Sequence, residues 1–88
     1  MYFWSMWKEE KDALHRTYEF KTFVAAIAFM VNAAMYIEQL DHHPEWTNVY
    51  NKVMVKLTTH DAGNTVTDKD HELSKVLDKV YEEVMSKG

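Results

Sequence analysis

The 88-residue sequence has no cysteine, a single proline, two glycines and no excess of basic residues. Without cysteine the chain forms neither a disulfide nor a thiolate metal site, which agrees with a reducing compartment such as the cytoplasm. The net charge of −4 disfavours direct nucleic-acid binding, because phosphate recognition needs clustered lysine and arginine. Residues 23–31 form the longest apolar run, far short of the roughly 20 residues that span a bilayer. Residues 1–7 lack the basic segment and cleavage site of a signal peptide, so we expect a cytoplasmic protein without membrane contact.

The composition predicts one folded domain over residues 1–88. Because 47% of the residues are hydrophobic and 14% are aromatic, intrinsic disorder is excluded. A chain this short has no room for a second domain and buries only a limited core. Self-association is therefore an expected source of further stability.

Two strands are predicted before the first helix. Residues 1–7 are rich in tyrosine, phenylalanine and tryptophan, which favour a half-buried pleated surface. Residues 8–12 are polar and have turn character. Residues 14–20 alternate with the period of two that is typical of a strand. We therefore expect an opening hairpin.

The first long helix is predicted to follow Thr22, whose hydroxyl is a suitable cap for the free N–H groups of a first turn. It should end near residues 40–42, because Pro44 disfavours the helical conformation at His43. Spacings of three and four define its expected buried face, which consists of Phe23, Ile27, Met30, Ala34 and Ile37.

Residues 46–59 have the pattern of strands. Asn48 and Asn51 are suited to a tight turn, so we predict a hairpin that turns at residues 48–51. A single continuous strand would instead hold His43 and His60 roughly 45 Å apart. The hairpin returns His60 to the end of the sheet where His43 lies.

A loop at residues 61–66 is predicted to lead into a final helix capped by Thr67, with Asp70 three residues later as in a capping box. The expected buried residues of this helix are Leu73, Val76, Leu77, Val80 and Val84. The resulting order is β-β-α-β-β-α. It indicates an α+β fold with a four-stranded antiparallel sheet and helices on one face.

Three of the five histidines lie at the junctions between these elements, and we expect them to share one pocket. His42 and His43 follow the carbonyl end of the first helix, where negative partial charge favours imidazolium. His60 lies where the last strand enters a loop. Imidazole transfers protons near neutral pH, so the set predicts acid–base chemistry. The plainer interpretation of an isolated His-His-Pro is a polar helix end with two solvated histidines. His15 and His71 are interpreted as surface residues.

Zinc binding and helix capping are alternative interpretations of some of these residues. Three histidines and a carboxylate are also typical of zinc sites, but the adjacent His42 and His43 do not readily bind one ion and no helical His-x-x-x-His pair is present. We therefore expect no metal. Asp70 is explained equally well as a helix cap and as a site residue, and it serves in both interpretations.

At these residues the sequence resembles the pterin-4a-carbinolamine dehydratases. The family's active-site pattern is matched by Glu38, His42-His43-Pro44, Tyr50, His60 and Asp70. The resemblance extends over nearly the whole chain from about Trp4. In two respects the chain differs: the usual N-terminal helix is absent or truncated, and the loop between His60 and Asp70 is one residue longer, with Asn64 where a second glycine is frequent.

The resemblance implies a hydro-lyase that dehydrates 4a-hydroxytetrahydrobiopterin to the quinonoid dihydropterin, without a cofactor, in tetrahydrobiopterin recycling. By analogy, His42 and His60 are the acid–base residues and His43 orients the substrate and the departing hydroxyl. The remaining expected substrate-binding residues are Glu38, Pro44, Thr59, Asp61, Ala62 and Asp70.

The resemblance also implies a second hypothesis, a binding module. Animal members of the family act as dimerisation cofactors of a homeodomain transcription factor through the exposed face of the central helix. Residues 22–40 could serve such a helical protein partner, with a nuclear location beside the cytoplasmic one, or could drive assembly of a homodimer or homotetramer. A pure interaction module would have no need of His42, His43 and His60 together.

Overall fold

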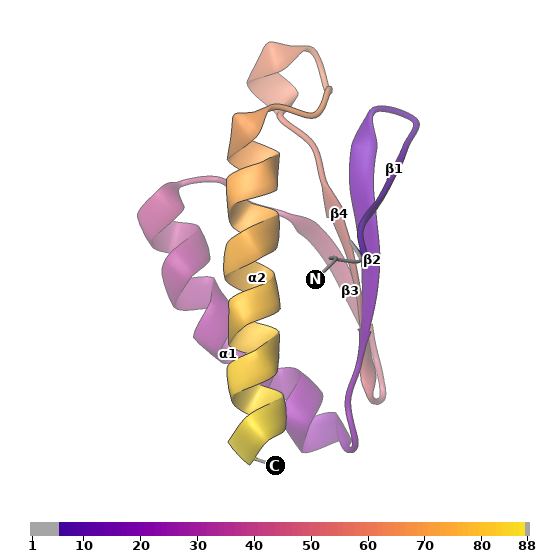
Figure 1. Cartoon of the computed structure of the whole chain (residues 1–88), viewed down its shortest axis with the longest axis vertical. Coiled ribbons are helices and arrows are strands. Elements are labelled where there is room, and N and C mark those ends of the chain that lie inside the picture. The colour runs from indigo at the N-terminus through magenta and orange to yellow at the C-terminus, as the bar shows by residue number, and fades with distance from the viewer. Residues whose placement is uncertain (1–5, 88) are drawn as a thin grey trace, which may run out of the picture.

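The computed structural model describes residues 6–87, in which a four-stranded antiparallel sheet is covered on one face by two α-helices (Figure 1). The strands lie in the order β1-β2-β4-β3. The predicted fold class and element order are confirmed. The elements are β1 (Lys8–Glu10), β2 (Ala13–Glu19), α1 (Phe23–Leu40), β3 (Glu45–Val49), β4 (Lys52–Leu57), a 3₁₀ turn (His60–Ala62) and α2 (Asp68–Lys87).

The opening hairpin is displaced along the chain from its predicted position. We expected the first strand at residues 1–7, but β1 begins at Lys8, within the segment that we had interpreted as a turn. The turn consists of Lys11 and Asp12, both with positive φ, a geometry that matches the twist of the flanking strands. The turn places the charged residues Lys8–Glu10 in the edge strand β1. Charged side chains on an edge strand oppose pairing with a strand of another molecule. Residues 1–5 lie outside the described residues.

The second hairpin turns where the sequence predicted. Tyr50 has a positive φ of 51°, and the side-chain amide of Asn48 donates to the carbonyl oxygens of Tyr50 and Lys52 at 3.2 and 2.9 Å. These contacts hold the two-residue connection between β3 and β4. In the resulting register, Glu45 pairs with Lys56. The start of β3 and the end of β4 therefore lie side by side.

Helix α1 begins and ends as predicted. The Thr22 hydroxyl accepts the N–H of Ala25 at 3.0 Å and caps the first turn. At the other end Asp41 takes a left-handed conformation, and its N–H donates to the carbonyl oxygen of Glu38. This terminates the helix and redirects the chain towards β3.

The predicted buried face of α1 was wrong in phase except at Ile37, which is buried as expected. The residues that the structure buries are Ala26, Phe29, Ala33 and Ile37. Phe23, on the predicted face, is 47% exposed, whereas Phe29 packs on Tyr18 with ring centroids 4.8 Å apart. Because residues 23–31 are apolar on all sides, spacing alone could not select the face that meets the sheet.

Helix α2 has the predicted capping box at its start. Asp70 Oδ2 accepts the N–H of Thr67 at 2.9 Å, and the Thr67 hydroxyl accepts the N–H of Lys69 at 3.3 Å. From the predicted stripe, Leu73, Leu77 and Val80 are buried, and Val76 and Val84 are half-buried against the same core. The core therefore lies between the sheet and both helices.

A polar cluster also joins β2 to α2. The carboxylate of Asp78 accepts hydrogen bonds from Arg16 at 2.6 Å, from the Tyr18 hydroxyl at 2.5 Å and from the Trp7 indole at 3.1 Å. Burial, together with the Asp78 carboxylate, raises the pKa of Tyr18. Tyr18 therefore stays a neutral donor, and the cluster fixes how α2 lies on the sheet.

Among the described residues, α1 is the helix that meets the length and hydropathy of a membrane span, with a mean hydropathy of 1.5 over 18 residues. The test considers length and composition alone, and the core helix of a water-soluble protein passes it too. Asn32 and Glu38 interrupt the apolar run without lowering the mean enough to fail the criterion. Only 22% of this window is buried, so much of its apolar surface faces outward.

Candidate active site

The predicted histidines meet where the α1–β3 connection passes the segment that follows β4. The left-handed Asp41 ends α1, so the chain turns directly into His42 and His43. The pairing of Glu45 with Lys56 places the residues before β3 beside those after β4. His60 begins the 3₁₀ turn just beyond that end of β4. The hairpin thus brings together residues that are distant along the chain.

A cleft of about 150 Å³ lies at this junction. It is lined by Asp41, His42, His43, Thr58, Thr59, His60, Asp61 and Lys69. All three predicted catalytic histidines are among these residues, together with the predicted Thr59 and Asp61. Sequence reasoning missed Asp41, Thr58 and Lys69. Each is adjacent in sequence to a predicted site residue, and Lys69 lies in the first turn of the helix that closes this end.

The other predicted substrate-binding residues lie around the cleft without lining it. Asp70 is fully buried, so in this structure it reaches the cleft only through the residues that it contacts. Glu38 is highly exposed on the last turn of α1. Pro44 is half-buried and Ala62 is exposed in the 3₁₀ turn. A direct substrate contact from any of the four stays a prediction.

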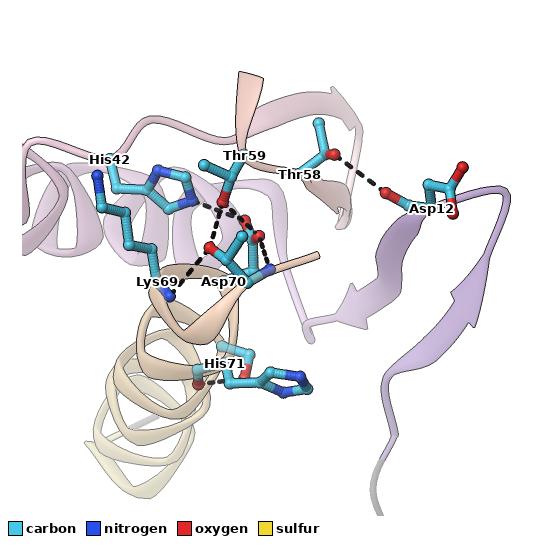
Figure 2. A network of polar contacts seen from close by, with 9 residues as sticks. Asp12, His42, Thr58, Thr59, Lys69, Asp70 and His71 are labelled. Carbon is cyan, nitrogen blue, oxygen red and sulfur yellow. Dashed lines mark hydrogen bonds and ion pairs between the residues drawn. The ribbon is translucent and has the colours of Figure 1, made fainter. Parts of the chain in front are cut away.

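His42 is the cleft histidine whose partner is a buried carboxylate. Its Nε2 lies 2.6 Å from Asp70 Oδ1, an ion pair when the ring is protonated. Figure 2 shows His42 and Thr59 reaching the same carboxylate from two different segments. The Thr59 hydroxyl donates to Asp70 Oδ2 at 2.7 Å, and the backbone N–H of Thr67 donates to the same oxygen at 2.9 Å. Both carboxylate oxygens therefore have partners.

These contacts keep Asp70 ionised. Burial on its own raises the pKa of a carboxyl group. Hydrogen bonds from His42, Thr59 and the Thr67 backbone outweigh it and hold the pKa of Asp70 below its ordinary value. Asp70 also lies in the first turn of α2, where the helix dipole favours negative charge. A charged acceptor thus faces His42 Nε2 near neutral pH.

His43 and Glu38 form a more open pair. His43 Nε2 lies 3.1 Å from Glu38 Oε1, and the two side chains are 57% and 83% exposed. Exposed ion pairs contribute little free energy, because water screens them and ordering both side chains costs entropy. This pair orients the His43 ring only loosely.

His60 has a partner within its own loop. Its Nδ1 lies 2.9 Å from the side-chain oxygen of Asn64. Asn64 has a positive φ of 60°, and its N–H donates to the carbonyl oxygen of Thr59 at 3.1 Å. The loop therefore folds back on His60, so that each of the three histidines of the cleft has one ring nitrogen engaged by an oxygen.

Two larger hollows lie elsewhere on the described part of the chain. One, of about 370 Å³, is an apolar groove between α1 and α2, and its lining includes Val24, Ala28 and Val84. The other, of about 440 Å³, lies over the face of the sheet that carries His15 and Lys56. Neither is lined by the histidines of the cleft.

The structure offers little for a metal ion. Within residues 6–87, no three histidine, aspartate or glutamate side chains are placed to hold one. His42 Nε2 and His43 Nε2 instead face carboxylates. The expectation that the chain works without a metal stays a prediction.

Residues 3–80 match the family model described as pterin 4 alpha carbinolamine dehydratase. A protein from Opitutus terrae, provisionally named pterin-4-alpha-carbinolamine dehydratase, is 54% identical over 74 residues, which are 84% of this chain and 76% of that protein. A protein of the same provisional name from Rhizobium rhizogenes is 52% identical over 70 residues, covering 80% of this chain and 68% of its own length.

Two solved structures share the fold. The crystal structure of a transcriptional coactivator/pterin dehydratase from Brucella melitensis superposes with a TM-score of 0.82 at 41% identity, over 86% of this chain and 82% of that one. A pterin dehydratase-like protein identified as a RuBisCO assembly factor in the alpha-carboxysome has a TM-score of 0.74 at 19% identity. That match covers 88% of this chain and 90% of the other, and shows the fold alone.

Proposed function

This chain belongs to the pterin-4-alpha-carbinolamine dehydratase family, a family of hydro-lyases, and from that premise we propose that it dehydrates 4a-hydroxytetrahydropterins by histidine acid–base catalysis. The substrate loses the hydroxyl on C4a as water and the proton on N5, and a C4a=N5 double bond forms. The product is the quinonoid dihydropterin. Its reduction would complete tetrahydrobiopterin recycling, which we place in the cytoplasm.

The observation that carries this proposal is the convergence of His42, His43 and His60 on one cleft. The reaction requires one proton to be given to the leaving hydroxyl and another to be taken from N5. Imidazole serves both tasks near neutral pH. Two rings on opposite sides of one heterocycle edge supply a donor and an acceptor without any cofactor.

Asp70 has a supporting role in this proposal. A carboxylate accepts hydrogen bonds and donates none, so the His42 nitrogen that faces it carries a proton. The 2.6 Å contact fixes both the orientation and the tautomer of the ring, as the aspartate of a catalytic triad does for its histidine. We therefore propose that Asp70 acts on the reaction by positioning His42.

The size of the cleft limits how the substrate binds. At about 150 Å³ it is smaller than the roughly 300–1,000 Å³ of sites that enclose a whole ligand. We therefore expect the edge that bears C4a and N5 to enter between the histidines while the pyrimidine ring lies outside. His43, which is more exposed than His42, would orient the departing hydroxyl from the rim.

Kinetics of histidine variants test the proposal. His60→Ala should lower kcat for dehydration by about 10²–10⁴, the usual contribution of a general acid or base. His71→Ala is the matched control, because His71 is exposed on α2 and does not line the cleft. Turnover by His60→Ala equal to that of the control would contradict the proposed mechanism and favour the binding-module hypothesis.

The outward face of α1 supports a second role, a helical interface. Its exposed large hydrophobic residues are Phe23, Val24, Val31, Met35 and Tyr36. Several large apolar side chains exposed on one helix often mark an interaction site. We propose that it joins copies of this chain into a homodimer or homotetramer, with a helical protein partner as the alternative occupant.

A further inference from the structure

We propose that Asn64 is a positioning residue that sets the tautomer of His60 and thereby makes His60 the proton acceptor of the reaction. The catalytic part of this inference rests on the proposed dehydration. The contact that carries it joins His60 Nδ1 to the Asn64 side-chain oxygen at 2.9 Å. Asn64 was not among the predicted site residues, and the family pattern has a glycine there more often.

The backbone of the loop holds Asn64 in place. Gly63 and Asn64 both adopt left-handed conformations, with φ of 86° and 60°. The Asn64 N–H donates to Thr59, and the Thr59 N–H donates in turn to the carbonyl oxygen of Thr65 at 2.9 Å. Asparagine is one of the few residues with a side chain that tolerate this conformation, so it provides an acceptor where glycine provides none.

The chemistry of imidazole turns this contact into a proton assignment. A neutral ring has one N–H donor and one nitrogen with a free lone pair. The amide oxygen of Asn64 only accepts, so Nδ1 of His60 carries the hydrogen. The free lone pair then lies on Nε2. A ring in this state is ready to take a proton, as a general base must be.

This tautomer assigns the two proton transfers. His60 Nε2 takes the proton from N5 as the C4a=N5 bond forms, and His60 becomes an imidazolium. The C4a–O bond breaks, and the hydroxyl leaves as water with a proton from doubly protonated His42, which becomes neutral. Exchange with solvent restores both rings. Atoms and charge balance without an oxidant, reductant or further reactant.

Two variants of Asn64 separate this role from a structural one. Asn64→Gly keeps the left-handed backbone but removes the acceptor, whereas Asn64→Asp keeps an acceptor oxygen. The readout is the ¹⁵N chemical shifts of the His60 ring nitrogens, which report the tautomer directly, together with kcat and KM for dehydration. Circular dichroism and thermal unfolding check that each variant is folded.

In the native chain we expect the Nδ1–H tautomer of His60. Asn64→Gly should populate both tautomers and lower kcat by about two- to tenfold, the factor that corresponds to one ordinary hydrogen bond. Asn64→Asp should retain the Nδ1–H tautomer, and its carboxylate should move the acidic limb of the rate profile to higher pH. The other titratable or charged groups that line the same cleft are Asp41, His42, His43, Asp61 and Lys69.

The Nε2–H tautomer in the native chain would overturn the inference, since it would mean that the amide nitrogen of Asn64 faces the ring. An Asn64→Gly variant with unchanged tautomer and turnover would overturn it as well. If the native chain has the Nδ1–H tautomer but does not dehydrate the carbinolamine, the proposed function fails, and with it the catalytic meaning of the tautomer. The spectroscopic and kinetic results thus separate the two failures.

Discussion

Asp70 belongs to two hydrogen-bonding systems at once. Its Oδ2 atom accepts the N–H of Thr67 and so completes the cap of α2. Its Oδ1 atom lies 2.6 Å from His42 Nε2 in the candidate active site. The start of α2 and the orientation of a proposed catalytic ring therefore depend on one buried carboxylate. Loss of its charge should affect both stability and turnover.

Asp70→Asn tests this coupling. An amide keeps the size and part of the capping ability of the side chain but loses the charge that faces His42. Charge-assisted hydrogen bonds contribute about 1.5–3 kcal/mol, so we expect kcat/KM to fall by roughly ten- to a hundredfold. Asp68→Asn, two residues earlier in the first turn of α2 and exposed, should change kcat/KM by less than about twofold. Equal kinetics in the two variants would contradict a positioning role for Asp70.

The lowered pKa of Asp70 predicts how the stability of the native chain depends on pH. The folded pKa of Asp70 lies below its ordinary value of 3.8, so the unfolded chain binds the proton more readily. The resulting stabilisation is fully present above about pH 5 and is lost as pH falls through the folded pKa. Asp70→Asn lacks this component. The difference in free energy of unfolding between the native chain and Asp70→Asn should therefore shrink as the pH falls. Urea titration at several pH values from pH 7 to pH 2 measures this difference. A difference that stays constant would refute the linkage.

For individual residues, the sequence predicted which of them converge on the cleft but not which hydrogen bonds they form there. The His42–Asp70 contact was outside its reach, because the spacing from Thr67 explained Asp70 equally well as a cap. The structure has both roles in one side chain. Lys69 was missed because the distance between α2 and the cleft depends on how the helix packs on the sheet. The Asn64 contact was hidden because a loop of positive-φ residues gives no periodic signal.

Among the elements, α1 decides how the core is filled. It places Phe29 among Tyr18, Phe20 and Tyr81, with ring centroids 4.8 to 6.4 Å apart. Aromatic clusters of this kind contribute more than their buried area alone. The orientation of α1 about its axis also fixes the direction in which Asp41 and His42 leave it, so the packing of Phe29 indirectly positions the cleft.

Substitution at two phenylalanines tests that orientation. Phe29→Ala should cost about 3–5 kcal/mol of unfolding free energy, because it leaves a cavity in the core. Phe23→Ala, at the half-exposed start of the same helix, should cost no more than about 1 kcal/mol. Urea denaturation followed by circular dichroism measures both. A larger loss of unfolding free energy in Phe23→Ala than in Phe29→Ala would contradict the observed orientation of α1 and favour the face predicted from the apolar spacing.

The success of the prediction varied among elements for physical reasons. The β3–β4 hairpin was predictable because Asn48 and Asn51 carry a local turn signal. The caps at Thr22 and Thr67 were predictable because their hydrogen bonds are local too. The phase of α1 was not, since an all-round apolar helix is oriented by tertiary contacts. The first strand was misplaced because turn geometry at Lys11 and Asp12, and not aromatic content, set the pairing.

For the whole molecule, the outward face of α1 is an apolar surface that the fold of a single chain leaves exposed. A chain of 10.4 kDa buries a modest core, and this helix leaves several large apolar side chains in contact with water. Helix α1 lies on one face of the sheet (Figure 1), and the cleft is lined by residues just beyond the C-terminal end of this helix. Assembly through the helix and access to the cleft are therefore compatible.

Met35→Glu tests whether this face joins copies of the chain. Met35 is 64% exposed on α1, and a charge there would oppose burial against an apolar surface. The native chain should have the mass of a dimer or tetramer, and Met35→Glu should shift it towards the monomer. Met6→Glu, at a similarly exposed methionine outside the helix, is the control and should keep the native mass. A native chain that is monomeric at high concentration would refute the interface.

The most direct test of the central claim is a crystal structure of the chain with a reduced pterin analogue that cannot be dehydrated. The account predicts that the edge bearing C4a and N5 lies between His42 and His60, with N5 within hydrogen-bond distance of His60 Nε2. An analogue bound instead in the groove between α1 and α2, or on the uncovered face of the sheet, with the histidine cleft empty, would contradict it.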